Sequence, residues 1–124
     1  MLCIIMEIEE LISIGQEVVA MLKEKKFSEI AEQYDYALKY DQEAEAAIKN
    51  DFLSSLKECI GSIENSNTEI TIKKFEENTT GLDTLIECDI PLEQNTGILV
   101  EIILSTKGSI YLEQISSYKT ENNA

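Results

Sequence analysis

The hydrophobic period of the chain changes once, near its middle. Before about residue 64, apolar residues recur every three or four positions, as they do along one face of an α-helix. After about residue 68 they alternate with polar residues, as they do on a half-buried β-strand. The polar segment Asn65-Ser66-Asn67 separates the two halves. Helices followed by consecutive strands predict an α+β fold, with the N-terminal helices packed on one face of an antiparallel sheet.

Three helices are expected in the first half of the chain, at 8–22, 29–38 and 41–63. In the first of them, glutamates at the start and lysines at the end suit the helix dipole. Ser28 is the expected N-cap of the second. Gly15 lies on the apolar stripe of the first helix, where glycine costs about 1 kcal/mol of helix stability relative to alanine. We therefore expect another helix to pack closely against Gly15.

Four strands are expected in the second half, at 68–76, 82–92, 97–105 and 109–118. Short segments rich in turn-forming residues join them, so a four-stranded antiparallel meander is the simplest arrangement. Pro91 has no amide proton and is expected at a strand end, a bulge or an edge. The residues expected to face the core on the two central strands are Ile86, Cys88, Ile90, Val100, Ile102 and Leu104.

The opposite face of this sheet combines acidic and apolar side chains. It is expected to carry Leu85, Glu87, Asp89, Leu99, Glu101, Ile103, Tyr111, Glu113 and Ile115. A solvated face needs few large apolar residues, and a purely structural face avoids like charges on adjacent strands, which repel by roughly 0.2–1 kcal/mol per opposed pair. The mixture therefore predicts a protein interface. Its candidate partner-binding residues are Glu87, Asp89, Glu101, Tyr111 and Glu113.

Two further arrangements of this face also fit the sequence. A homodimer formed by two copies packed face to face would cover it, and so would the C-terminal tail. A fallback surface for binding a partner lies in the helical half, at Asp35, Asp41 and Glu43.

The charge balance favours a basic protein as the partner. The sequence has 24 Asp and Glu residues against 10 Lys and Arg, a net charge of −14, and it has no histidine. Such a negative field repels nucleic acid and anionic lipid and attracts basic surfaces. Without histidine, the chain lacks the side chain that most often moves protons near neutral pH and most often binds metals. We therefore expect binding rather than catalysis, with neither nucleic acid nor membrane as the partner.

Length and cysteine content point to one small intracellular domain. The 124 residues suit a single domain, expected over 1–118 with a polar tail at 119–124. Cys3, Cys59 and Cys88 show no Cys-x-x-Cys spacing, which predicts free buried thiols in a reducing cytoplasm and neither a metal site nor a cofactor. The sequence also contains no run of about 18 apolar residues that would span a bilayer. A cytoplasmic location is therefore expected.

Several stretches of the chain resemble a known group of domains. They are the helical stretch from Ile8 to Phe27-Ser28-Glu29-Ile30, the strand Ile86-Glu87-Cys88-Asp89-Ile90-Pro91-Leu92, the run from Gly97 to Leu104, and the Gly108 hairpin. These stretches resemble small bacterial domains that are uncharacterised or linked to toxin immunity. The order of helices and then a four-stranded meander resembles the cystatin-like α+β roll of the nuclear-transport-factor-like superfamily. The resemblance covers nearly the whole chain, and it implies this roll as the fold.

For function, the resemblance implies an immunity protein of a toxin or contact-dependent growth-inhibition system. The charge supports a nuclease as the toxin, because nucleases present basic clefts to phosphates. An acidic inhibitor that places Glu and Asp in such a cleft mimics the substrate and associates rapidly by electrostatic steering. A generic protein-interaction module is the broader form of the same hypothesis.

The resemblance also implies a pocket-based alternative, in which the chain carries a small ligand or acts as an acid/base enzyme. Rolls of this superfamily can enclose an apolar cone, and some members use Asp and Tyr around a small molecule. Here Tyr34-Asp35-Tyr36 and Tyr40-Asp41 would line the mouth. Against this, a Tyr next to an Asp on a helix is more often a half-buried packing residue beside a solvated charge.

Overall fold

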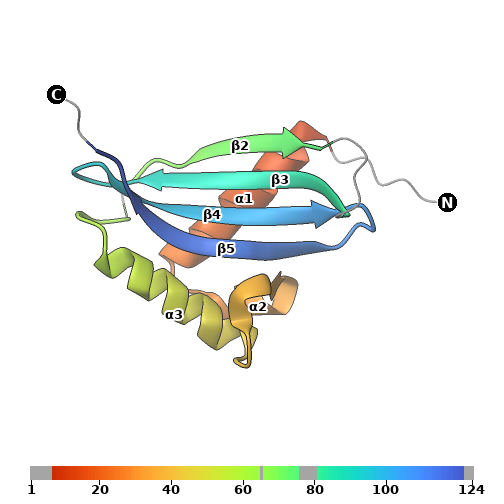
Figure 1. Cartoon of the computed structure of the whole chain (residues 1–124), viewed down its shortest axis with the longest axis horizontal. Helices are drawn as coiled ribbons and strands as arrows, with labels where there is room; N and C mark the ends of the chain where they lie inside the picture. The colour runs from red at the N-terminus through yellow and green to blue at the C-terminus, as the bar shows by residue number, and fades with distance from the viewer. Residues whose placement is uncertain (1–6, 65, 76–80, 122–124) are drawn as a thin grey trace.

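The computed structural model describes residues 7–64, 66–75 and 81–121. In this part of the chain the helices are α1 (Ile8–Lys23), α2 (Phe27–Gln33) and α3 (Ala44–Lys57), with a 3-10 turn at Ala37–Lys39. The strands are β1 (Asp35–Tyr36), β2 (Glu69–Lys74), β3 (Leu82–Pro91), β4 (Thr96–Ser105) and β5 (Ile110–Lys119). The predicted α+β class is therefore confirmed (Figure 1).

The strands form one sheet in the order β1-β5-β4-β3-β2. β2 to β5 pair antiparallel along the chain, as predicted, but β1 pairs parallel to β5. The expected sheet of four antiparallel strands is thus wrong in detail, because a fifth, two-residue strand makes the sheet mixed. Pro91 ends β3, in agreement with prediction. Beyond β5, the amide of Thr120 donates to the carbonyl of Asn95 at 2.9 Å, so the expected tail is still bonded at this residue to the connection between β3 and β4.

The helix predicted at 29–38 ends early because of a tertiary contact. Tyr34 is extended, with φ −135° and ψ 138°, and closes α2 after Gln33. Tyr36 is fully buried in β1; its hydroxyl donates to Oδ2 of Asp51 at 2.5 Å and accepts from the amide of Ile115 at 3.3 Å. This contact joins β1, α3 and β5, and it overrides the local helical periodicity.

The other predicted helix boundaries also need correction. Ser28 lies inside α2 rather than at its N-cap, which is Lys26. α3 occupies only part of the predicted 41–63, because Glu43 is its N-cap and Glu58 its C-cap. The residues that follow α3 leave the helix to bond the sheet: the amide of Ile60 donates to Oγ1 of Thr96 at 3.0 Å.

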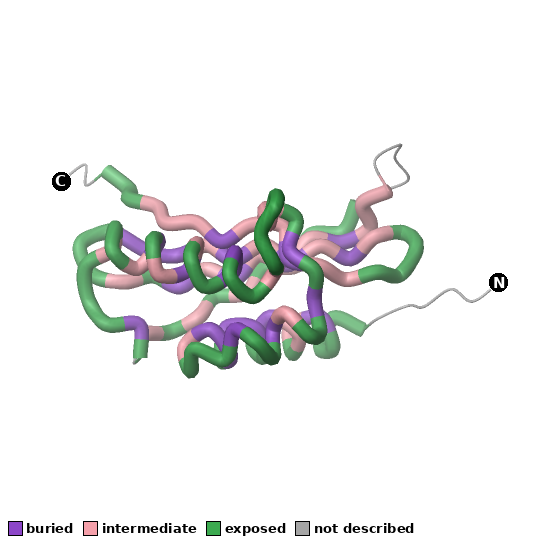
Figure 2. Tube along the Cα trace, turned by 90° about the horizontal axis from the view of Figure 1, so that it is seen from below, coloured by how far each residue is buried: buried purple, intermediate pink, exposed green. Residues whose placement is uncertain are grey.

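The helices lie on one side of the sheet and along one of its edges. α1 crosses behind β2 and β3 in Figure 1, while α2 and α3 lie along the edge formed by β5 and β1. Figure 2 shows the buried residues of α1 turned toward the strands. No helix of the described residues covers the opposite face of the sheet, which is turned to the viewer in Figure 1.

The inner face of the central strands forms the core predicted from their alternation. Its six expected members Ile86, Cys88, Ile90, Val100, Ile102 and Leu104 are all buried. Cys59 and Cys88 carry free thiols, and burial raises the pKa of Cys88 to about 12. Cys3 lies outside the described residues. Within those residues, no helix is long and apolar enough to cross a membrane.

Gly15 contacts the sheet rather than a neighbouring helix, contrary to expectation. A Cβ at this position would lie 3.0 Å from Sγ of Cys88, 3.0 Å from Cδ1 of Ile70 and 3.2 Å from Cγ2 of Ile86. These distances are shorter than ordinary van der Waals contact. The missing side chain is therefore what allows the backbone of α1 to approach β2 and β3.

Replacing Gly15 by valine is expected to destabilise the fold by about 1–3 kcal/mol, the usual cost of overpacking a core. The added carbon atoms would push α1 away from β2 and β3. Urea denaturation measures the change. Ser13→Val is the matched control, because Ser13 is exposed on the same helix. Equal stability of the two variants would contradict this account of Gly15.

Candidate functional site

The uncovered side of the sheet carries a continuous set of partly exposed side chains, which we call the outer face. It consists of Glu69, Thr71 and Lys73 on β2, Leu85, Glu87 and Asp89 on β3, Leu99, Glu101 and Ile103 on β4, and Tyr111, Glu113, Gln114, Ser116 and Tyr118 on β5. All five predicted partner-binding residues belong to this face. None of the five is fully buried.

Three carboxylates form what we call the acidic cluster: Glu87, Glu101 and Glu113. Glu87 and Glu101 lie directly opposite each other on β3 and β4. Burial raises the pKa of Glu101, and the charges of Glu87 and Glu113 raise it further, whereas Lys73 lowers it. Lys73 forms an ion pair with Glu87, with Nζ 2.6 Å from Oε1. One lysine thus faces three acids, so the cluster has an uncompensated negative charge.

Apolar side chains border the acidic cluster on one side. Leu85, Ile103 and Tyr111 form a row across three strands, since Leu85 pairs with Ile103 and Ile103 with Tyr111. Burial raises the pKa of Tyr111, and the charge of Glu113 adds to the effect, so its hydroxyl stays neutral and can donate a hydrogen bond. Aromatic and apolar residues beside charged groups are the composition of a protein interface.

Asp89 is held in place by a residue that the sequence analysis missed. The hydroxyl of Tyr118 donates to Oδ1 of Asp89 at 2.5 Å, and burial raises the pKa of Tyr118, as does this bond. The Tyr118 ring lies over Gly97, where a Cβ would come within 2.3 Å of the ring. A glycine inside a strand is a signal for such a close approach. Asp89 is therefore partnered within the chain, whereas Glu101 has no hydrogen bond or ion pair with another described residue.

Ile115 does not lie on the outer face, contrary to prediction. The pairing of β4 with β5 shifts by one residue, because Glu101 pairs with Gln114 but Ile102 pairs with Leu112. This bulge changes the phase of β5, so that Ile115 turns into the core with 4% exposure. Gln114 takes the outer position opposite Glu101 instead.

The fallback residues lie away from the outer face. Asp35, Asp41 and Glu43 are all exposed, in and after β1 and before α3. Asp35 forms an ion pair with Lys39, with Oδ1 2.6 Å from Nζ, and the hydrogen bond from Lys39 lowers the pKa of Asp35. The carboxylate of Asp35 therefore points to solvent, while its neighbour Tyr36 fills the interior. Nearby Tyr40 is 79% exposed.

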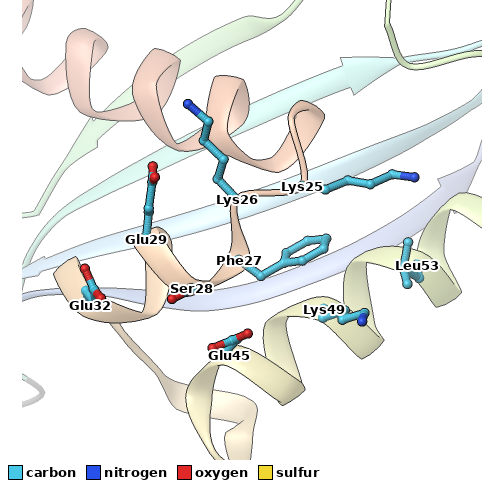
Figure 3. Close-up of a pocket in the computed structure, with 9 residues that line it drawn as sticks. All are labelled: Lys25, Lys26, Phe27, Ser28, Glu29, Glu32, Glu45, Lys49 and Leu53. Carbon is cyan, nitrogen blue, oxygen red and sulfur yellow. The ribbon is translucent and has the colours of Figure 1, made fainter.

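A groove of about 770 Å³ lies between the start of α2 and α3. It is lined by Lys25, Lys26, Phe27, Ser28, Glu29, Glu32, Glu45, Lys49 and Leu53. In Figure 3 the amino groups of the three lysines point in different directions, and the three glutamates lie toward the other side of the groove. Lining groups of mixed sign that do not converge give this groove no single ligand chemistry. Within the described residues, no group of three potential ligands is arranged to hold a metal ion.

Comparison with known proteins leaves the geometry as the basis for inference. No family model matches the chain, and neither a curated protein nor a solved structure shows significant similarity to it.

Replacing Glu101 by glutamine is expected to stabilise the protein at pH 7 by roughly 0.2–1 kcal/mol, the size of a like-charge pair on adjacent strands. Because the pKa of Glu101 is raised above its ordinary 4.5, the folded state binds this proton more readily than the unfolded chain. The contribution of Glu101 to stability is therefore lost as pH rises through the folded pKa. The gain of Glu101→Gln should accordingly vanish near about pH 3.5, where the carboxyl is protonated in both states.

Urea denaturation at the two pH values measures this difference. Glu32→Gln is the control, because Glu32 is exposed on α2. A Glu101→Gln variant that is less stable than wild type at pH 7 would show that the carboxylate stabilises the fold rather than destabilising it.

Proposed function

We propose that the chain is an acidic binding domain whose outer face blocks a basic protein, and that this partner is a toxin of the nuclease type. In this role the chain is an immunity protein acting in the cytoplasm. The observation that carries the proposal is the acidic cluster: three neighbouring carboxylates, one lysine, and a bordering apolar row on a face that no described helix covers.

The acidic cluster would interact more favourably with cations of a partner than with water. Glu101 is partly desolvated in the free protein, so part of the cost of removing water from it is already met by folding. Two lysine or arginine side chains from a partner would neutralise the two charges that Lys73 leaves uncompensated. The net charge of −14 would also speed encounter with a basic cleft by long-range attraction.

The fold is consistent with the cystatin-like roll, and we propose that superfamily for the chain. The antiparallel order of β2 to β5, with helices on one side, is what such a roll requires. In this proposal the sheet serves as a rigid platform, and its outer face presents the binding residues.

Removing the three charges of the acidic cluster is expected to slow binding to the partner. The triple variant Glu87→Gln, Glu101→Gln, Glu113→Gln should associate about tenfold more slowly at low salt, because steering depends on net charge. Its association rate should also depend less on salt, since fewer charges are left to screen. Stopped-flow kinetics at several NaCl concentrations measures both effects.

The control for this experiment is Glu29→Gln, Glu32→Gln, Glu45→Gln, which removes the same charge from the groove beside α2. Equal slowing by both triple variants would mean that only net charge matters. If changes at Asp35, Asp41 and Glu43 abolished binding while the sheet triple variant bound normally, the interface would lie in the helical half.

Replacing Tyr111 by alanine is expected to act on dissociation. A half-buried aromatic residue at the centre of an interface contributes about 2 kcal/mol, equivalent to roughly thirtyfold faster dissociation. Tyr111→Phe should retain most of the affinity, because the ring remains. Tyr40→Ala is the control, since Tyr40 is exposed outside the outer face. Unchanged dissociation of Tyr111→Ala would place Tyr111 at the rim.

The partner itself can be found by capture from lysate at low salt, followed by elution at high salt. The proposal requires that the captured protein be basic, and that the purified chain inhibit its nuclease activity at equimolar amounts. Capture of a protein whose activity is unaffected would support only a general interaction module.

A further inference from the structure

β2 forms an edge of the sheet whose hydrogen-bonding groups face outward. It is the last strand in the order β1-β5-β4-β3-β2, and it borders the upper edge of the sheet in Figure 1. The amide of Phe75 donates to the carbonyl of Asp83 at 2.9 Å, in register with the pairing of β2 and β3. Because antiparallel ladders alternate, the odd-numbered residues of β2 bond to β3. Ile70, Ile72 and Lys74 therefore direct their N–H and C=O groups away from the sheet.

The side chains of β2 are complementary to a second copy of the same strand. In an antiparallel pair centred on Thr71, Glu69 lies opposite Lys73 of the second copy, and Lys73 lies opposite its Glu69. On the inner face, Ile70 lies opposite Ile72 of the second copy. Opposite charges and β-branched residues are the cross-strand pairs that stabilise a sheet. Residues 69 to 73 thus each meet a suitable partner.

We propose that β2 pairs antiparallel with β2 of a second copy about a two-fold axis at Thr71, joining the two sheets into one. Ile70 and Ile72 then exchange both backbone hydrogen bonds across the axis, and their half-buried side chains become covered. The two Thr71 side chains meet on the outer face. The occupant of this edge is a second copy of the chain, since the complementarity arises from a single sequence read in both directions.

The charges around β2 favour this register. Within the chain, Glu69 lies directly opposite Asp89, a like-charge pair that is unfavourable by itself. Lys73 of the second copy would supply a cation beside Glu69. Lys73 already bonds Glu87 of its own chain at 2.6 Å, so it would lie between two carboxylates.

Neighbouring registers are less favourable. Pairing about Ile72 would set Ile70 opposite Lys74 and Thr71 opposite Lys73, which places an ammonium group against an apolar residue. Pairing about Ile70 would leave both lysines unpaired. Edge lysines normally prevent strands from joining. The register centred on Thr71 is the one that turns Lys73 into an attractive contact.

The edge pairing is independent of the proposed partner on the outer face, and salt distinguishes the two. Each copy has a net charge of −14, so two copies repel at long range. Raising NaCl from about 0.01 M to about 0.3 M shortens the Debye length from about 30 Å to under 10 Å and should strengthen the dimer. The same change should weaken binding to a basic protein.

Sedimentation of the full chain between about 10 μM and about 1 mM in 0.3 M NaCl tests the dimer. We expect a mass near twice 14.0 kDa at the higher concentrations. Thr71→Lys should abolish the dimer by placing two lysines on the axis, and Thr71 is exposed, so the monomer should still fold. Ser28→Lys is the control with the same charge change at an exposed position on α2. A monomer throughout, or a dimer that survives Thr71→Lys, would overturn the proposal.

A charge exchange tests the register. Glu69→Lys and Lys73→Glu should each weaken the dimer about tenfold or more, because each change creates two like-charge pairs. The double variant carries both changes and should recover affinity, since the side chains at positions 69 and 73 would again have opposite charges across the axis. A double variant weaker than either single one would exclude this register.

Hydrogen exchange reports on the backbone directly. The amides of Ile70 and Ile72 should exchange more slowly as protein concentration rises, whereas the amide of Thr71, bonded to β3, should be unaffected. Rapid exchange at Ile70 and Ile72 in a sample that sediments as a dimer would mean that the copies meet elsewhere, for example through their outer faces.

Discussion

The apolar inner face of β3 and β4 is the constraint on which the rest of the structure depends. Burying one isoleucine side chain contributes about 1.5–3 kcal/mol, whereas an opposed pair of like charges on a sheet costs roughly 0.2–1 kcal/mol. A slip of one residue would expose Ile86 and Ile102 and bury Glu87 and Glu101. The core therefore sets the register, and the acidic cluster lies on the outer face as a consequence.

The bulge in β5 changes which residues of this strand face the core. Without it, Ile115 would join the outer face and the second half of β5 would lose its contact with the core. The extra residue lets Leu112 and Ile115 both turn inward, although three positions separate them. Without the bulge, Glu113 would lie directly opposite Glu101; with it, Gln114 takes that place, and the charge of Glu113 still raises the pKa of Glu101. The bulge that lets β5 pack against the core therefore also sets the position of Glu113 in the acidic cluster.

The elements that the sequence predicts well are those with a long, uninterrupted period. α1 and strands β2 to β5 follow their expected ranges within a few residues, because many positions agree on each. α2 and β1 are short, and Tyr36 leaves the helical pattern for a bond to Asp51, fifteen residues further along the chain. No local pattern contains that contact. Gly15 gave a correct signal of close packing, but periodicity alone does not tell which element approaches.

Some features of the candidate site likewise follow from a regular sequence pattern, and others do not. Alternation was sufficient to place Glu87, Asp89, Glu101 and Tyr111 on one face, because each belongs to a strand in regular register. Neither the bulge at Glu113 nor the bond from Tyr118 to Asp89 follows from alternation. Both depend on how β5 fits against its neighbours. The alternation thus predicts which residues share the face, and the structure shows that Asp89 is bonded to Tyr118 while Glu101 has no such bond among the described residues.

If the acidic cluster binds a basic protein, as we propose, it also limits which partner can bind. Once a partner excludes water, an unpaired carboxylate costs more than in the free protein, while a correctly placed cation gains more: two charges 4 Å apart interact by about 1 kcal/mol in water and about 4 kcal/mol at an effective dielectric of 20. Lys73 already satisfies Glu87, so in the proposed complex Glu101 and Glu113 would each need a cation from the partner. Glu101 and Glu113 lie on adjacent strands, which are about 4.8 Å apart. The two cations would therefore have to be spaced by about this distance, give or take the reach of a side chain. A basic protein with scattered lysines would leave one acid unpaired, so the binding that we propose would select for paired cations rather than for positive charge in general.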